Sequence, residues 1–93
     1  MVIGILELEL SIPMADSLKA KRMVLRSLKD RIRRNFNVSI AEVDDNDVWQ
    51  TAGLAVVTVS NDKRFANQVL SKVVDYLGGA HDLVLDDYRL SFF

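Results

Sequence analysis

The sequence predicts one α+β domain with the element order βαββαβ, in which two helices cover one face of an antiparallel sheet. Three observations lead to this prediction. The chain has 93 residues, the length of a single domain. Its apolar residues alternate at period two in some segments and recur at helical spacing in others. The polar and glycine-containing stretches that separate these segments are typical of turns.

Residues 2–12 form the first predicted strand, because apolar and polar side chains alternate there. Pro13 ends it. Asp16 or Ser17 then offers a helix N-cap, and apolar residues at helical spacing continue as far as residue 36. Asn35 or Asn37 is expected to close this helix in the left-handed conformation. The apolar positions of this helix are Leu18, Val24, Leu25, Leu28, Ile32 and Phe36.

Residues 37–44 form a second predicted strand and residues 48–60 a third, with the polar turn Asp44–Asp47 between them. Gly53 suggests a bulge in the third strand. Residues 60–62 cap a second helix, and Gly78-Gly79 ends it. A last strand follows over 82–93. The apolar stripe of the second helix is Phe65, Val69, Leu70, Val73 and Leu77.

Two right-handed β-α-β crossovers joined by a hairpin place both helices on the same sheet face. The arrangement is a ferredoxin-like sandwich with a four-stranded antiparallel sheet. The other face has no helix to cover it and is expected to be acidic where it is exposed. The residues expected to decorate it are Glu7, Glu9 and part of the set Glu42, Asp44, Asp86 and Asp87.

Composition narrows the classes of function. The chain has no cysteine, which excludes disulfides, thiolate chemistry and cysteine-based metal sites. No apolar run approaches the roughly 20 residues of a membrane span, and the chain starts in a strand-like segment without a signal-peptide pattern. We therefore expect a soluble cytoplasmic protein.

The charge is strongly polarised along the chain, although the net charge is only −1. Residues 16–34 hold eight basic and two acidic residues, and the remainder holds four basic and eleven acidic residues. Five of the cations fall within one third of the helix circumference at spacings of 3, 4, 3 and 4, and no acidic residue interrupts them. We call this set the basic stripe; it consists of Lys19, Arg22, Arg26, Lys29 and Arg33.

The basic stripe is consistent with phosphate binding or with a solvated helix face. Like charges at this spacing repel by about 0.2–0.5 kcal/mol per pair, and cations are unfavourable near a helix N-terminus, which favours an anionic partner. Lys21 and Arg34 would be outer contributors. Lys21, however, falls on the apolar side of the helix, where it either snorkels from the helix end or forms a partly buried ion pair with a strand carboxylate.

Other polar clusters favour ordinary structural roles. The Asp44–Asp47 turn lacks the spacing of a calcium loop, so we expect a solvated turn and no metal site. Glu7 and Glu9 are interpreted as surface residues, and His81 as a solvent-exposed loop residue. RNA-recognition motifs of this topology stack bases on aromatics of the two central strands, here 2–12 and 52–60, which contain none. The candidate stacking aromatics elsewhere are Trp49, Tyr88, Phe92 and Phe93.

Several strings of the sequence resemble the YlxP-like family of small bacterial proteins. They are S-L-K-A-K-R at 17–22, V-L-R-S-L-K-D-R at 24–31, F-N-V-S-I-A-E-V-D at 36–44, Trp49-Gln50 and V-S-N-D at 59–62. The resemblance covers nearly the whole chain. It implies a ferredoxin-like fold and a cytoplasmic location. The neighbourhood of the family's genes to those of translation initiation and ribosome maturation suggests RNA or ribosome association. The resemblance supplies no catalytic residues.

The function expected from the sequence is a non-enzymatic RNA- or ribosome-associated factor that needs no cofactor. It would contact phosphates through the basic stripe, with Lys21 and Arg34 at its margins. The alternative is a protein-interaction or dimerisation module whose basic helix meets an acidic protein surface, such as the acidic sheet of a second copy. Because the sheet leaves one face bare, we also expect a homodimer. No small-molecule substrate is indicated.

Overall fold

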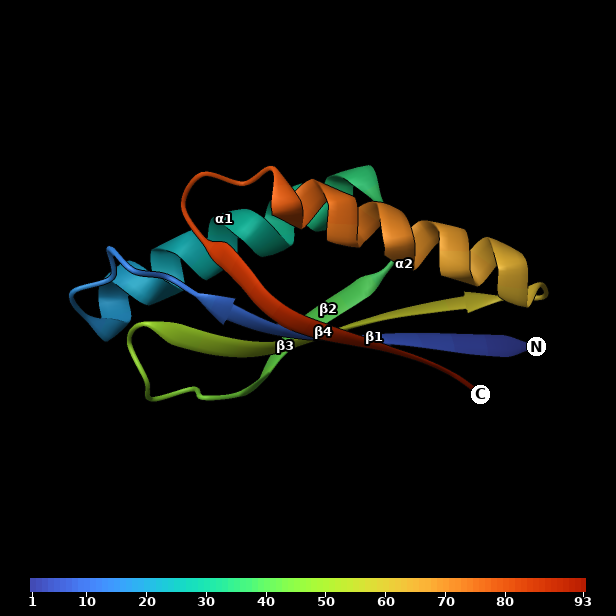
Figure 1. The fold of residues 1–93 in the computed structure, drawn as a ribbon, viewed down its shortest axis with the longest axis horizontal. Coiled ribbons are helices and arrows are strands. Elements are labelled where there is room, and N and C mark those ends of the chain that lie inside the picture. The colour runs from blue at the N-terminus through green and yellow to red at the C-terminus, as the bar shows by residue number, and fades with distance from the viewer.

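A computed structural model describes all residues, 1–93, and contains the six expected elements in the expected order (Figure 1). The predicted βαββαβ arrangement is therefore confirmed. None of its helices is long and apolar enough to cross a membrane. The elements are β1 (Val2–Ser11), α1 (Leu18–Asn35), β2 (Ser39–Asp44), β3 (Thr51–Ser60), α2 (Lys63–Gly78) and β4 (Val84–Phe92).

The sheet has the strand order β2-β3-β1-β4, and all neighbouring strands are antiparallel. Both helices lie on the same side of it, as Figure 1 shows, and the opposite side has no covering element. This is the ferredoxin-like arrangement. The two central strands are β1 and β3, as the sequence predicted, and β2 and β4 form the edges.

The core lies between the sheet and the helices. Alternate residues of β1 and β3 point toward the helices because successive side chains of a strand project to opposite faces. These residues are buried and pack against the inner faces of α1 and α2. The strand residues in this core are Leu6, Leu8, Leu10, Ala52, Leu54 and Val56, and the helix residues are Leu25, Leu28, Ile32, Leu70, Val73 and Leu77.

The N-terminus of α1 follows the sequence prediction, but its C-terminus does not. The Ser17 hydroxyl accepts a hydrogen bond from the amide of Ala20 at 3.0 Å, which makes Ser17 the N-cap. The C-cap is Phe36, in an extended conformation, and neither Asn35 nor Asn37 has a positive φ. The expected left-handed closure is wrong because the chain passes directly from α1 into the extended segment before β2.

The third strand begins later than predicted, at Thr51 instead of residue 48. The expected bulge is present, but its extra residue lies in β2, where the register shifts between Glu42 and Asp44 opposite Gly53. A Cβ atom on Gly53 would lie 2.7 Å from the Cβ atom of Asp44. The glycine is therefore needed for the close approach of the bulged strand.

Helix α2 begins after Asp62, whose carboxylate accepts a hydrogen bond from the amide of Arg64 at 3.0 Å, and it ends at Gly78. One residue of its predicted apolar stripe is misplaced. Phe65 is 57% exposed, whereas its neighbour Ala66 is buried. The buried residues Ala66, Leu70, Val73 and Leu77 recur at spacings of 4, 3 and 4 on one helix face, and Phe65 lies about 100° away from the middle of that face.

The uncovered sheet face, which we call the open face, differs from the prediction in composition. It is acidic over only one half, around Glu7, Glu9 and Asp87, and apolar over the other. Glu42 does not belong to it, because this side chain reaches an α1 lysine on the helix side of the sheet. The sequence prediction counted the carboxylates but overlooked the apolar residues that share their strand face.

Candidate nucleic-acid interface

The basic stripe lies along one flank of α1, on the side of edge strand β2. The inward side of the helix is formed by Lys21, Leu25, Leu28 and Ile32, so the stripe is rotated roughly 110° from the core, at about 100° per residue. Lys19, Arg22 and Arg26 are exposed, and Lys29 is half-buried. None of these four forms an ion pair or side-chain hydrogen bond. The stripe is about 21 Å long, given a rise of 1.5 Å per residue.

Arg33, the fifth member, is partly engaged. Its Nη2 donates a hydrogen bond to the carbonyl oxygen of Ile40 in β2 at 3.0 Å, and its Nη1 lies 3.8 Å from Asp30. These contacts fix the C-terminal end of the stripe over the sheet edge. Arg33 remains half-exposed, so it can contribute to the local potential while it holds α1 to β2.

Two further cations of α1 lie outside the stripe. Arg31 lies on the opposite flank, 3.5 Å from Asp82 in the loop between α2 and β4. Arg34 is exposed and forms no ion pair. At 100° per residue it lies about 100° from the middle of the stripe. Arg34 therefore lies beside the stripe, and its contact with phosphate stays a prediction.

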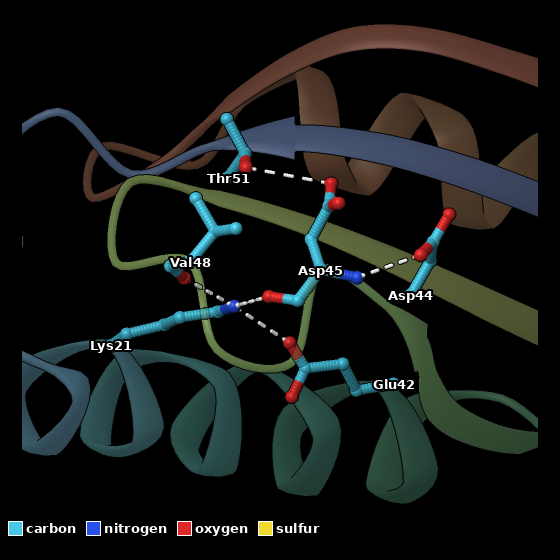
Figure 2. Close-up of polar contacts among 6 residues, drawn as sticks. All are labelled: Lys21, Glu42, Asp44, Asp45, Val48 and Thr51. Atoms are coloured by element: carbon cyan, nitrogen blue, oxygen red, sulfur yellow. Dashed lines mark hydrogen bonds and ion pairs between the residues drawn. The ribbon is translucent and has the colours of Figure 1, made fainter.

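Lys21 does not belong to the surface at all. Its side chain is only 1% exposed, and its Nζ lies 2.8 Å from Oε2 of Glu42 (Figure 2). The same Nζ donates hydrogen bonds to the carbonyl oxygens of Asp45, at 2.5 Å, and Val48, at 2.6 Å. An ammonium group has three donors, and all three have partners here. The prediction that Lys21 contacts phosphate is wrong, and the alternative of an ion pair with a strand carboxylate is confirmed.

The N-terminus of α1 is therefore a weaker anion site than the sequence suggested. One of its free amide groups, that of Ala20, already donates to Ser17, and Lys21 turns inward. Only Lys19 and Arg22 remain as cations of the first turns. The row of exposed cations along the flank of the helix is present, as the sequence predicted.

A feature that the sequence prediction missed is the anchored loop of residues 45–50. The Lys21 ammonium group, which projects from α1, donates to the carbonyl oxygens of Asp45 and Val48 in this loop (Figure 2). Asp45 turns the chain with a φ of 60°. The loop carries Trp49, which is 51% exposed. The available signal was Lys21 itself, because a lysine among core positions of a helix requires buried acceptors.

The other predicted candidates are distributed over the molecule. His81 and Asp44–Asp47 are exposed, as expected for a loop residue and a solvated turn. Tyr88 and Phe93 are 48% and 74% exposed on the β4 side, whereas Phe92 packs against the core, with Nζ of Lys63 5.3 Å from its ring centroid. These aromatics do not gather with the basic stripe.

Comparisons with known proteins agree with this architecture. Two solved structures resemble the whole chain at low identity and therefore show the fold alone. One is LarC2, the C-terminal domain of a cyclometallase involved in synthesis of the NPN cofactor of lactate racemase (TM-score 0.53, 14% identity); the present chain spans 55% of it. The other is the de novo designed protein LFR1 1 with a ferredoxin fold (TM-score 0.52, 13% identity), of which the chain covers 84%.

Sequence relatives are more informative about ancestry. The uncharacterized protein YlxP of Bacillus subtilis (strain 168) is 36% identical over 76 residues, which are 82% of this chain and 83% of that protein. The model of the family described as "Protein of unknown function (DUF503)" matches residues 3–90. The resemblance to YlxP-like proteins is thus confirmed, and the chain belongs to this family.

Proposed function

We propose that the protein is a non-enzymatic, cytoplasmic RNA- or ribosome-associated factor that binds phosphates through the basic stripe of α1. The observation that carries this proposal is the set of four stripe cations without any partner within the protein. The chain has 13 acidic residues, yet none neutralises these four. Their mutual repulsion costs stability, and an anionic backbone would relieve it.

The chemistry of the stripe favours phosphates over bases. Lysine and arginine on a convex helix flank can follow a phosphate backbone, and such contacts position a protein without reading sequence. The two central strands carry no aromatic residue on which bases could stack, and the open face carries carboxylates that repel phosphate. Selectivity would therefore depend on RNA shape or on a second protein.

The test compares two triple variants of equal charge change. Lys19, Arg22 and Arg26 are exposed stripe residues without contacts, and each is replaced by Gln. The control replaces Lys63, Arg64 and Lys72 of α2, which are also exposed. Binding to a fluorescent 20-base-pair RNA hairpin and to purified ribosomal particles is measured over a salt series.

We expect the wild-type protein to show a slope of log affinity against log salt of roughly −3 to −4, as four or five neutralised phosphates would give. The stripe variant should lose about two units of that slope and at least tenfold in affinity, whereas the control should change little. Thermal stability of the stripe variant should hold or rise slightly. Equal losses in both variants would show that only net charge matters and would contradict the proposal.

A second candidate function is protein interaction or dimerisation, in which the basic stripe meets an acidic protein surface. The observation that favours it is the acidic half of the open face, which a second copy would offer. Because the stripe and the open face lie on different sides of the molecule, repeated contacts of this kind would be head-to-tail. Sedimentation at micromolar concentration tests it: the assembly should dissociate at high salt and be absent in the stripe variant.

A further inference from the structure

The open face is divided along the strands into an apolar half and an acidic half. The apolar half lies toward the start of β1, where Ile3 faces Val59 and Ile5 faces Val57. Phe93 exchanges two backbone hydrogen bonds with Ile3 at the same end. Val59 is 63% exposed and Phe93 74%. Contiguous exposed apolar side chains on a sheet face typically mark an interaction surface.

The acidic half contains a hollow of about 270 Å³ whose floor includes Gly53. Its carboxylates come from three strands: Glu7 and Glu9 of β1, Asp44 of β2 and Asp87 of β4. Glu7 is paired with Arg89, but the other three have no cationic partner. The carboxylates of Asp44 and Asp87 each accept one hydrogen bond, from the amide of the next residue. The hollow therefore keeps several uncompensated negative charges.

One pair in this hollow works against the stability of the sheet. Glu9 lies directly opposite Asp87 in the β1–β4 register. Like charges in directly opposed positions are destabilising. Arg89 also lines the hollow, but its guanidinium is bonded to Glu7, and neither Glu9 nor Asp87 forms an ion pair. A cationic group placed between them from outside would remove the repulsion and gain two ion pairs.

A second copy stacked face to face cannot satisfy both halves. An overlap restricted to the apolar halves would cover only part of each face, because β2 pairs no further than Ser39 opposite Val57. Such an overlap is small beside the roughly 800 Å² of accessible surface that each partner buries in a stable interface. A larger antiparallel overlap would press the carboxylates of one copy onto the apolar half of the other, which desolvates them without compensation.

The basic helix of a second copy is also an incomplete partner. Its stripe could meet the acidic half, but its apolar side chains Leu25, Leu28 and Ile32 are buried in its own core. The apolar half of the open face would stay uncovered. The face instead matches a partner that brings exposed apolar and cationic groups together.

We propose that the open face is a docking site for a basic amphipathic segment of another protein. Apolar side chains of that segment lie on Ile5, Val57 and Val59, and one or two of its lysine or arginine residues enter the hollow beside Glu9 and Asp87. The acidic half requires a cationic group and the apolar half requires apolar side chains, so the partner must carry both. The site does not involve α1 and is independent of phosphate binding by the basic stripe.

The experiment uses a fluorescent 18-residue peptide of Leu and Lys arranged as an amphipathic helix, and a matched peptide with Glu in place of Lys. The test variant combines Glu9→Gln with Val59→Ser, both at exposed positions. The control variant combines Asp75→Asn with Phe65→Ser, which remove an exposed carboxylate and an exposed apolar group from α2. Anisotropy gives the affinities, amide chemical shifts locate the contact, and sedimentation gives the oligomeric state.

We expect the lysine peptide to bind the wild-type protein with a micromolar Kd and to shift amides of β1, β3 and β4. The test variant should bind at least tenfold more weakly, the control within twofold of wild type, and the glutamate peptide not measurably. The proposal fails if the lysine peptide binds no tighter than millimolar, if both variants lose affinity equally, or if the shifts map to the helices. It also fails if the free protein is a dimer that the test variant converts to monomers, because a second copy then covers the face.

Discussion

At the scale of single residues, burial of Lys21 costs hydration energy, and the contacts of the same side chain connect α1 to β2 and to the loop of residues 45–50. A lysine that is 1% exposed loses its hydration, and the pair with Glu42 together with two backbone carbonyls compensates for that loss. Apart from this ion pair, Oε2 of Glu42 is buried without a hydrogen-bond partner. Removing either residue would therefore leave the other as a buried charge without its ion-pair partner.

We expect Lys21→Met to lower the free energy of unfolding by about 2–4 kcal/mol, because it leaves the Glu42 carboxylate and two carbonyl groups without their cationic partner. Adding Glu42→Leu should recover part of that loss, since a buried apolar pair avoids the desolvated charge. The measurement is equilibrium urea unfolding. Lys19→Met, at an exposed position without contacts, is the control and should stay within about 0.5 kcal/mol of wild type. Similar values for the two single variants would show that the buried pair contributes nothing.

At the scale of elements, local signals located the helices and strands, and tertiary contacts decided where they end. The alternation of β1 and the Ser17 cap of α1 were legible because each depends on residues close in sequence. The start of β3 was not, because residues 45–50 follow contacts with Lys21, more than 20 positions away. The C-terminus of α1 was misjudged for the same reason, since packing between elements overrides local propensity. The placement of Phe65 was an error of periodicity, because helical spacing from Leu70, Val73 and Leu77 points to Ala66 as the inward residue.

The basic stripe was predictable as a row on one helix flank, because helical spacing fixes it. Which lysine of that helix is free was less evident. Lys19 and Lys21 differ by only two positions, yet one is exposed and the other is enclosed by the 45–50 loop. Wheel position alone gave two interpretations of Lys21, and only the acceptors contributed by β2 and the loop distinguish them.

Ser17, the N-cap of α1, and Ser27 within the helix allow a test of how much the cap contributes. Ser17→Ala removes the hydrogen bond to the amide of Ala20 and should destabilise the protein by about 0.5–2 kcal/mol. Ser27→Ala, at an exposed position within the helix, should be neutral or stabilise it by a few tenths of a kcal/mol, because alanine has the higher helix propensity. Thermal unfolding of both variants in one buffer measures the difference. A shift of the same sign and size in both would mean that the cap is unimportant.

At the scale of the whole molecule, the charge polarity visible in the sequence becomes a difference between two faces. The helix layer carries the basic stripe, and the opposite face carries the acidic half with its hollow. The sequence indicated the negative charge of that face. It did not reveal the apolar half, although Ile3, Ile5, Val57 and Val59 occupy alternate positions of two strands. Val2, Leu6 and Val56 beside them are apolar as well and conceal the alternation.

Because the two surfaces lie on different sides, we expect them to bind their partners independently. The stripe lies on α1 and the acidic hollow on the opposite face of the sheet, and solvent-exposed charges further apart than the Debye length of about 8 Å are largely screened at physiological ionic strength. The stripe variant, with Lys19, Arg22 and Arg26 replaced by Gln, should bind the Leu/Lys peptide within twofold of the wild-type protein. Conversely, the Glu9→Gln, Val59→Ser variant should retain its affinity for the RNA hairpin. Each ligand is titrated separately at 150 mM salt, since the cationic peptide would bind RNA directly in a mixture. A variant that loses both ligands to the same degree, with unchanged thermal stability, would show one continuous surface and contradict the division into two sites.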